Sequence, residues 1–317
     1  MSDVHRHRGH VAVTGATGFV GSILVQELHQ RGIRTLALLR DETSIPGIEC
    51  AAVGDLEQAS DLVSRLRGLD CVVHLAGRAH VLKETEKDPL KAFTAANVDA
   101  TVRIAEASAN AKVRRFVFVS TIKVNGEFTS GSPFRPYDPP NPVGAYAQTK
   151  RIAESKLEGI SRATGLEVVI IRPPLVYGPG VKGNFARLMR LVDKGLCLPL
   201  GAATNKRSMV SVYNLCDLFI KCIDHPHAPG GTFLVSDGKD LSSAELVCEL
   251  ATAINRRPRL ITAPLPLIKA ALKLAGQRGD VERLFESLQV DIQETTEKLG
   301  WKPPYTVEEG LRKCVTG

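Results

Sequence analysis

A glycine triplet near the start of the chain constrains its fold more than any other feature. Gly15, Gly18 and Gly21 are three residues apart, and they stand between a short apolar run (10–13) and a segment with apolar residues at helical spacing (20–31). Gly15 permits a sharp turn, Gly18 lets the backbone approach a pyrophosphate, and Gly21 allows close packing of helix on strand. The unpaired amides and the dipole of the helix start then hold the anion. The triplet therefore predicts a dinucleotide-binding loop.

The rest of the first half alternates short apolar runs with helical patterns, which is typical of βαβ units around a parallel sheet. Strands are expected at 35–39, 51–53, 71–75, 116–119 and 167–171, helices at 97–109 and 146–161, and a returning strand at 232–235. We therefore expect an α/β fold, a Rossmann-like doubly wound parallel sheet with a smaller, mostly C-terminal substrate-binding lobe. Residues 1–9 are then a flexible tail, residues 10–173 with the strand near 232–235 form the dinucleotide lobe, and residues 174–231 and 236–317 form the substrate lobe.

Charge and cysteine usage narrow the function classes. The 317 residues carry 41 Lys and Arg against 34 Asp and Glu, a net charge of +7, but the basic residues are scattered. This pattern argues against nucleic acid and is compatible with phosphorylated small molecules. The seven cysteines are odd in number and form no C-x-x-C pair, so no disulfide framework or zinc site is expected. We expect a protein of the reducing cytoplasm.

The two ends of the chain raise two alternatives that we do not favour. His5, His7 and His10 could hold a metal, but a solvated tail explains a polar His/Arg-rich start better, and no metal is expected. No apolar run reaches the ~18 residues of a membrane span. The apolar segment 264–275 contains lysines, as interfacial anchors do, but a helix packed in the substrate lobe is the simpler interpretation. We expect no stable membrane insertion.

The coenzyme's ribose should be recognised at the end of the second strand. An acidic residue there bonds the 2′-hydroxyl of NAD, and an arginine there accommodates the 2′-phosphate of NADP. The strand at 35–39 is followed by Arg40 and then Asp41. Arg40 favours NADP because its guanidinium is planar and permanently charged, whereas Asp41 could still serve NAD. Asp55, after the third strand, is expected near the adenine.

A tyrosine–lysine pair is the candidate for the chemistry. Of the five tyrosines only Tyr146 has a lysine four residues later, Lys150, which lies on the same face of a helix. A tyrosine, with a pKa near ~10, is a poor acid or base unless a cation lowers that pKa. Lys150 can supply the cation and also bond the nicotinamide ribose. Ser120 and Thr121 end a neighbouring strand, where a hydroxyl can donate to a substrate oxygen.

Together, the glycine triplet, the hydroxyl pair and Tyr146-x-x-x-Lys150 resemble the extended short-chain dehydrogenase/reductase family, and its nucleotide-sugar epimerase/dehydratase branch in particular. The resemblance runs from about Val11 to the C-terminus. It includes the segment 172–180 (RPPLVYGPG), which resembles the approach to the branch's sugar site. Counted back from Gly126, Thr121 takes the family's catalytic Ser/Thr position.

The resemblance implies a set of ligand contacts and a UDP-linked sugar as substrate. The catalytic residues that the resemblance implies are Thr121, Tyr146 and Lys150. Coenzyme contacts are expected from Gly15, Thr17, Gly18, Phe19, Val20, Gly21, Arg40, Asp55, Leu56, Leu75, Ala76, Gly77, Asn97, Ser120, Tyr146, Lys150 and Pro173. Substrate contacts are expected from Lys123, Asn184, Arg207 and a C-terminal arginine, Arg283 in preference to Arg278. The family also implies a homodimer paired through the helices at 97–109 and 146–161.

The residues after Thr121 narrow the reaction. The branch's 4,6-dehydratases carry Asp-Glu there for water elimination, whereas this chain has Ile122 and Lys123. A 4-keto reductase and a 4-epimerase remain. The segments 122–126 and 287–291 most resemble bacterial reductases that turn a UDP-4-keto-6-deoxy-N-acetylhexosamine into UDP-N-acetylquinovosamine. We expect that reaction first and a UDP-hexose (UDP-glucose or UDP-N-acetylglucosamine) 4-epimerase as the alternative. A non-catalytic NADP-sensing scaffold is disfavoured by the tyrosine–lysine pair.

Overall fold

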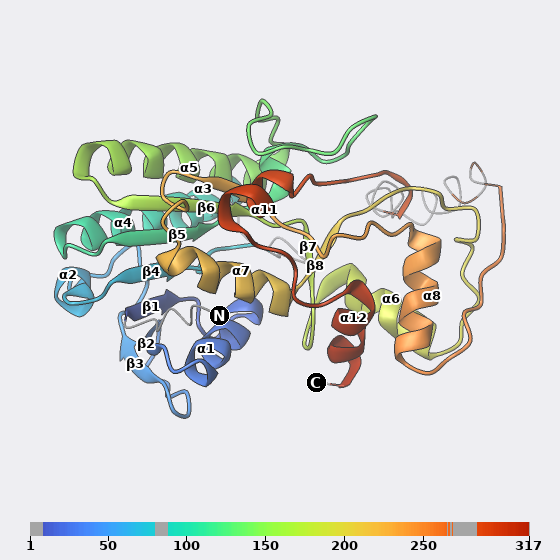
Figure 1. Cartoon of the computed structure of the whole chain (residues 1–317), viewed down its shortest axis with the longest axis horizontal. Coiled ribbons are helices and arrows are strands. Elements are labelled where there is room, and N and C mark those ends of the chain that lie inside the picture. The colour runs from blue at the N-terminus through green and yellow to red at the C-terminus, as the bar shows by residue number, and fades with distance from the viewer. Residues whose placement is uncertain (1–8, 80–87, 265, 267, 269–283, 317) are drawn as a thin grey trace.

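The computed structural model describes residues 9–79, 88–264, 266, 268 and 284–316, and its centre is a parallel β-sheet (Figure 1). Seven strands are ordered β3-β2-β1-β4-β5-β6-β9 and every neighbouring pair is parallel. These strands are β1 (His10–Thr14), β2 (Arg34–Leu39), β3 (Glu49–Ala52), β4 (Cys71–His74), β5 (Arg115–Val119), β6 (Glu167–Arg172) and β9 (Thr232–Leu234). The order reverses between β1 and β4, which confirms the predicted doubly wound Rossmann-like fold.

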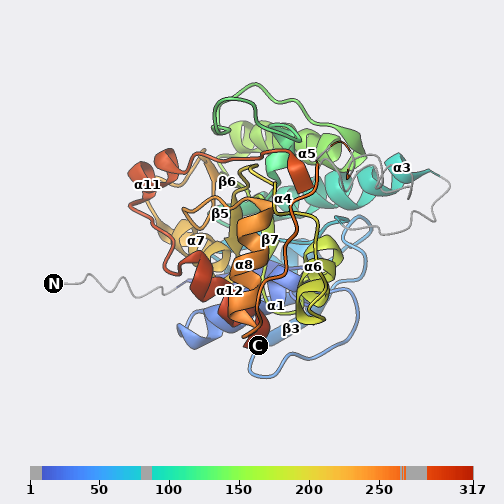
Figure 2. The ribbon, with the colours of Figure 1, turned by 90° about the vertical axis from the view of Figure 1, so that its right-hand side faces the viewer.

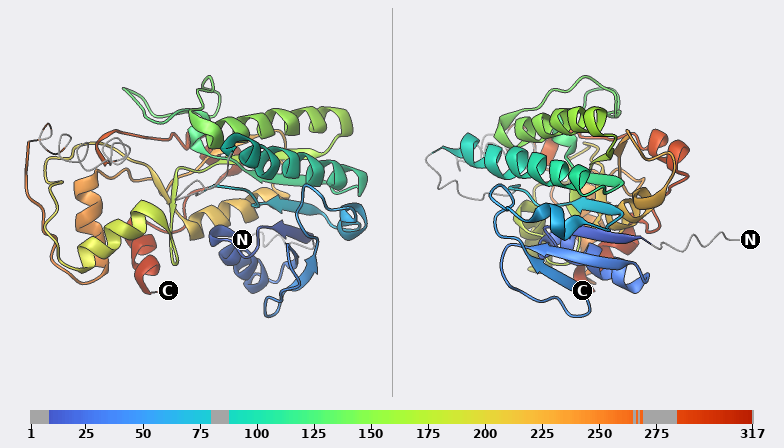
Figure 3. Two further views of the ribbon diagram at one scale, coloured as in Figure 1. Left: turned by 180° about the vertical axis from the view of Figure 1, so that it is seen from behind. Right: turned by 90° about the vertical axis from the view of Figure 1, so that its left-hand side faces the viewer.

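Helices cover both faces of the sheet because its strands are apolar on both sides. One face is covered by α1 (Phe19–Gln30) and α7 (Val212–Asp224), the other by α2 (Leu62–Leu66), α4 (Ala100–Asn110) and α5 (Gly144–Thr164). Seen from behind, α4 and α5 lie side by side (Figure 3). Apolar residues of β1 face both layers, since Val11 and Val13 join the first core and Ala12 joins the second.

A second, smaller core lies beyond the carboxyl ends of the strands. It contains a parallel pair, β7 (Leu175–Tyr177) and β8 (Met209–Ser211), together with α6 (Gly183–Asp193), α8 (Ser243–Ala253) and α12 (Val307–Thr316). Figure 1 shows these three helices toward the right-hand end of the molecule, and Figure 2 shows them from that end. Within the described residues, the remaining short elements are α3 (Pro89–Thr94), the π-helical turn η1 (Ala95–Asp99), the 3-10 turn η2 (Ile122–Val124) and α11 (Gln293–Leu299).

The predicted helix at 97–109 differs from the observed one in a way that affects the site. Three helical pieces run through residues 89–110, and the middle one, η1, is a π-helical turn that contains Asn97. A π-helical turn holds one extra residue, so it changes which side chains point inward, and such turns frequently occur at functional sites. No helix within the described part of the chain has the length and apolarity that a membrane span requires.

Candidate functional site

The phosphate loop has the geometry that its glycines predicted. Gly15 has a φ of +67°, and its carbonyl accepts a hydrogen bond from the amide of Gly18 at 2.9 Å. Gly18 is the N-cap of α1. A β-carbon on Gly21 would lie 2.1 Å from the carbonyl oxygen of Gly15, so the helix meets the loop at a distance that only glycine allows. The loop and the helix start together form a cradle that fits a pyrophosphate.

Arg40 and Asp55 form an ion pair at the carboxyl ends of β2 and β3. The Arg40 Nε lies 2.8 Å from Asp55 Oδ1, and the two side chains are 75% and 49% exposed. A backbone hydrogen bond holds the two segments close to each other, because the amide of Gly54 donates to the carbonyl oxygen of Arg40 at 3.1 Å. The arginine expected to meet a 2′-phosphate therefore already faces a carboxylate.

A buried polar network supports the turn after β4. His74 Nδ1 lies 2.7 Å from Thr14 Oγ1, and His74 Nε2 lies 3.0 Å from Thr101 Oγ1. Burial is the main cause that lowers the pKa of His74 to about 3, with a smaller contribution from Lys150. The imidazole is thus neutral at pH 7, and it connects β1, β4 and α4 beneath the coenzyme loop. The sequence reasoning did not identify this histidine.

Asn97 holds the next stretch of backbone, residues 77–78. Its Oδ1 accepts from the amide of Arg78 at 2.8 Å, and its Nδ2 donates to the Arg78 carbonyl at 3.1 Å and to Thr149 Oγ1 at 3.2 Å. A β-carbon on Gly77 would lie 2.8 Å from Asn97 Oδ1. The predicted contact residues Gly77 and Asn97 therefore touch each other, and Thr149 links them to the catalytic helix α5.

The three predicted catalytic side chains converge at the carboxyl end of β5. Thr121 caps η2, and its hydroxyl makes a side-chain hydrogen bond with Tyr146. Lys150 is buried and donates from Nζ to the carbonyl oxygen of Val119 at 2.9 Å, with the Phe118 ring centroid 4.5 Å away. Tyr146 and Lys150 come from the first two turns of α5, which runs alongside β6 on one face of the sheet (Figure 1).

One electrostatic expectation is wrong in this structure. Lys150 was predicted to lower the pKa of Tyr146, but burial raises that pKa to about 12, and only the hydrogen bond from Thr121 opposes the rise. The ammonium is bonded to the carbonyl of Val119 instead. Burial also lowers the pKa of Lys150 to about 8, and Glu154 opposes that effect.

Ser120 supplies an independent indication of a ligand between β5 and α5. Its side chain is buried, and its Oγ has no hydrogen-bond partner among the described residues. Buried hydroxyls are normally bonded, so this oxygen fits a polar ligand atom. With the phosphate cradle at one end and Ser120, Tyr146 and Lys150 at the other, the residues present fit an extended dinucleotide.

The predicted substrate contacts are spread over three segments. Lys123 follows Thr121 and forms an ion pair with Glu127, with Nζ 2.8 and 2.9 Å from the two carboxylate oxygens. Asn184 lies in the first turn of α6, and Arg207 precedes β8 and donates from Nη1 to the Glu286 carbonyl at 3.0 Å. Arg278 and Arg283, and most of the apolar segment 264–275, lie outside the described residues.

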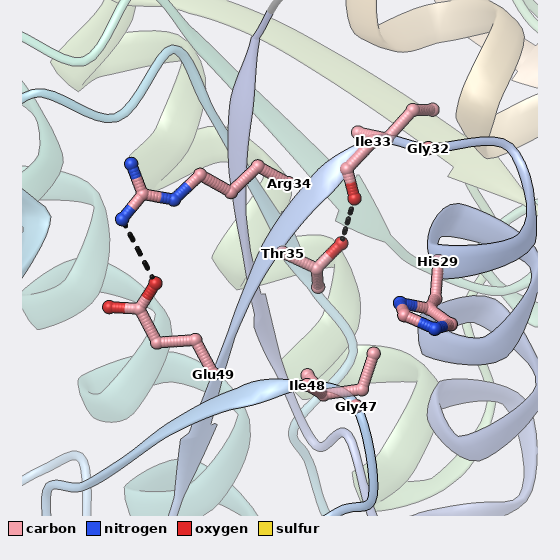
Figure 4. Close-up of a pocket in the computed structure, with 8 residues that line it drawn as sticks. All are labelled: His29, Gly32, Ile33, Arg34, Thr35, Gly47, Ile48 and Glu49. Atoms are coloured by element: carbon pink, nitrogen blue, oxygen red, sulfur yellow. Dashed lines mark hydrogen bonds and ion pairs between the residues drawn. The ribbon is translucent and has the colours of Figure 1, made fainter.

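A separate pocket of about 340 Å³ lies far from these residues (Figure 4). It is lined by residues of the α1–β2 turn and the start of β3, among them His29, Arg34 and Glu49. Arg34 and Glu49 pair across it at 3.2 Å. These positions are the amino ends of β2 and β3, the opposite edge of the sheet from the glycine triplet. The pocket is therefore not part of the coenzyme site.

Comparison with known proteins shows the family of the chain. A model of the NAD dependent epimerase/dehydratase family matches residues 11–236. A UDP-glucose 4-epimerase of Vibrio cholerae is 45% identical over 307 residues, covering 96% of this chain and 93% of the relative. The solved structure of MoeE5 in complex with UDP-glucuronic acid and NAD is 25% identical, with a TM-score of 0.77 and coverage of 97% and 98% of the two chains. A UDP-N-acetylglucosamine 4-epimerase from Bacillus cereus shares the fold, with a TM-score of 0.80 at 21% identity over 96% and 98%. The chain belongs to the NAD-dependent epimerase/dehydratase family.

Proposed function

We propose that the chain is an NAD-dependent 4-epimerase of UDP-hexoses. The observation that carries this function is the 45% identity, over almost the full length of both chains, with the UDP-glucose 4-epimerase of Vibrio cholerae. This reaction is the alternative, not the first expectation, of the sequence reasoning. The Arg40–Asp55 ion pair supports NAD, because a 2′-phosphate would have to displace or approach the carboxylate of Asp55.

In this mechanism Tyr146 moves the proton of the sugar's O4. Bound NAD would supply the acceptor and donor of the C4 hydride, and its cationic ring would favour the phenolate of Tyr146. Tyr146 Oη accepts the O4 proton as C4 is oxidised and gives it back when C4 is reduced on its other face. The hydroxyl of Thr121 forms a hydrogen bond with Tyr146. In the proposed mechanism it also forms a hydrogen bond with the sugar's O4 and so orients that oxygen. Lys150 keeps a positive charge beside the pair.

The runner-up is a 4-keto reductase that forms UDP-N-acetylquinovosamine. The specific observation in its favour is the position of Arg40, whose side chain is 75% exposed at the end of β2. An arginine there can turn toward a 2′-phosphate and make the coenzyme an exchangeable NADPH. The same tyrosine would then donate its proton to O4 once, with no return step.

One purified preparation separates the two functions. We expect UDP-glucose to be converted to UDP-galactose, or UDP-N-acetylglucosamine to UDP-N-acetylgalactosamine, without net change in nicotinamide absorbance. We also expect the purified protein to contain bound NAD, which acid denaturation would release. Stoichiometric oxidation of NADPH by a UDP-4-keto-6-deoxy-N-acetylhexosamine, without interconversion of the hexoses, would replace the epimerase by the reductase. Tyr146→Phe is the negative control in both assays.

We further propose a cytoplasmic homodimer. Support for the compartment comes from the seven cysteines, none of which forms a disulfide. Support for pairing comes from α4 and α5, which lie together as the outer layer of one face of the sheet (Figure 3). Light scattering of the purified protein measures the mass directly, and a charge placed at Ile152, a 45% exposed apolar side chain of α5, should then favour the monomer.

A further inference from the structure

The two halves of the catalytic site are joined by one buried arginine. Thr121 caps η2 just after the end of β5, whereas Tyr146 and Lys150 belong to α5. Arg172, the last residue of β6, is 4% exposed and bonds both segments. Its Nε and Nη2 donate to the two carboxylate oxygens of Glu154 at 2.9 and 2.7 Å, and its Nη1 donates to Asn125 Oδ1 at 3.0 Å.

The two partners of Arg172 lie close to the catalytic residues, Glu154 to Lys150 and Asn125 to Thr121. Glu154 lies one turn beyond Lys150 on α5 and is fully buried. Asn125 ends η2, the turn that Thr121 caps. The backbone repeats the connection, because the amides of Ser120 and Ile122 donate to the carbonyls of Ile171 and Pro173 at 2.7 and 3.0 Å. The neighbours of Thr121 in the chain are thus bonded to the neighbours of Arg172.

We infer that Arg172 and Glu154 are positioning residues for the proposed 4-epimerase reaction, holding the Thr121 turn and the Tyr146–Lys150 helix at a fixed separation. A planar, bidentate guanidinium suits this task, because it fixes direction as well as distance. The inference rests on the proposed function for its kinetic consequence only. Displacement of a reacting group by about 1 Å can cost about a hundredfold in rate.

The Arg172–Glu154 pair also affects the protonation of Lys150. Lys150 is surrounded by Glu154 on its own helix, by neutral His74 on β4, and by the Val119 carbonyl and the Phe118 ring on β5. Glu154 is the anion that opposes the lowering of the Lys150 pKa, and it forms ion pairs with Arg172 and Arg151 at 2.7 and 3.4 Å. Removing the Glu154 charge should therefore lower the Lys150 pKa below its value of about 8.

The chain contains a matched control for a purely structural role. Arg115 at the start of β5 is 2% exposed, bonds Glu167 through Nε and Nη2 at 2.8 and 2.7 Å, and donates to the carbonyls at the end of α7. It is a buried, glutamate-paired arginine on the neighbouring strand, at the amino edge of the sheet. Arg172→Lys and Arg115→Lys each keep the positive charge but lose the planar guanidinium with its several hydrogen-bond donors.

The test measures kcat, thermal stability and the titration of Lys150 in the wild type, Arg172→Lys, Arg115→Lys and Glu154→Gln. We expect Arg172→Lys to lose about a hundredfold in kcat with little change in KM, while Arg115→Lys loses stability but keeps its kcat. Protein carrying carbon-13 at lysine Cε, with the Lys150 signal identified by Lys150→Met, reports the second effect without any substrate. In Glu154→Gln that signal should titrate about one pH unit lower than in the wild type.

Equal loss of kcat in the two arginine variants would overturn the positioning role. An unchanged Lys150 titration in Glu154→Gln would overturn the charge role, even if Arg172→Lys does not fold. If the wild type interconverts no UDP-hexose, the proposed function fails, and the titration still decides the charge role because it needs neither substrate nor turnover.

Discussion

The ammonium of Lys150 donates a hydrogen bond to the carbonyl oxygen of Val119, 2.9 Å away, and so attaches the catalytic helix to the last residue of β5, two residues before Thr121. The contact keeps the cation inside the site but directs it at the backbone and not at Tyr146. Activity therefore depends on two separate properties, the phenol of Tyr146 and the protonation of Lys150.

The phenol is tested by Tyr146→Phe. We expect turnover to fall by about 10²- to 10⁴-fold, the usual contribution of a positioned acid–base group. Bound NAD and the melting temperature should change little, because only the hydroxyl is removed. Steady-state epimerisation assays measure the loss, and Tyr137→Phe, at a 70% exposed tyrosine, is the control. Wild-type turnover in Tyr146→Phe would rule out the mechanism.

The protonation of Lys150 predicts a pH dependence. Its pKa in the fold is about 8, so the cation is present below pH 8 and is lost as the pH rises through that value. We expect kcat to decline above pH 8. Because the pKa of an unfolded lysine is higher, near 10.5, the folded state binds fewer protons between the two values, and stability should rise with pH there. Lys150→Met should remove that rise in denaturant titrations, whereas Lys156→Met on the same helix should not.

The phosphate loop predicts opposite outcomes for two glycines. Gly21→Ala would bring a β-carbon to 2.1 Å from the carbonyl of Gly15, so we expect loss of NAD binding by calorimetry together with lower stability. Gly159 lies in α5, and a β-carbon added there would meet no atom within 4 Å. Gly159→Ala should leave NAD binding unchanged and stabilise the protein by up to about 1 kcal/mol. Tight NAD binding by Gly21→Ala would show that the coenzyme lies elsewhere.

The Arg40–Asp55 ion pair predicts a route to altered coenzyme choice. Asp55→Asn removes the carboxylate that lies 2.8 Å from Arg40, and Arg40 then becomes available to a 2′-phosphate. We expect the ratio of the NADP and NAD dissociation constants to shift toward NADP by about tenfold, or about 1.4 kcal/mol. Calorimetric titration with both coenzymes measures the ratio, and Glu57→Gln controls for charge removal alone. An unchanged ratio would exclude this pair from coenzyme selection.

His74 predicts sensitivity to acid. Burial lowers its pKa to about 3 in the folded state, against 6.5 in the unfolded chain, so the unfolded state binds more protons between these values. Unfolding free energy should fall below pH 6.5 by about 1.4 kcal/mol per pH unit for this one group. Chemical denaturation at several pH values measures the slope. His74→Gln should flatten it, and substitution of the exposed His227 should not.

Much of this architecture could be predicted because its signals are local. The glycine triplet, the alternation of strands and helices and the Tyr146–Lys150 spacing each occupy a few consecutive residues, and the fold class they predict is confirmed. Periodicity also predicted a helix around Asn97, but it could not predict the π-helical turn, because one extra residue in a turn leaves the apolar pattern nearly unchanged.

The groups that sequence reasoning missed are held by contacts between distant segments. His74 meets Thr14 across 60 residues, and Arg172 meets Asn125 across 47, so no spacing rule identifies either. The prediction that Lys150 lowers the pKa of Tyr146 was wrong for a related reason. Helical spacing places Lys150 on the same face, but the direction of its long side chain is decided by the Val119 carbonyl, which belongs to a strand.

The position of β9 has a consequence for synthesis. Its three residues, 232–234, form the outer strand beside β6, and they come after β7, α6, β8 and α7 in the chain. A nascent chain that has emerged from the ribosome only as far as Arg172 therefore leaves β6 as an open edge. β6 gains its neighbour β9 only after the intervening sixty or so residues have been translated, and until then β6 is the strand that a chaperone would need to shield.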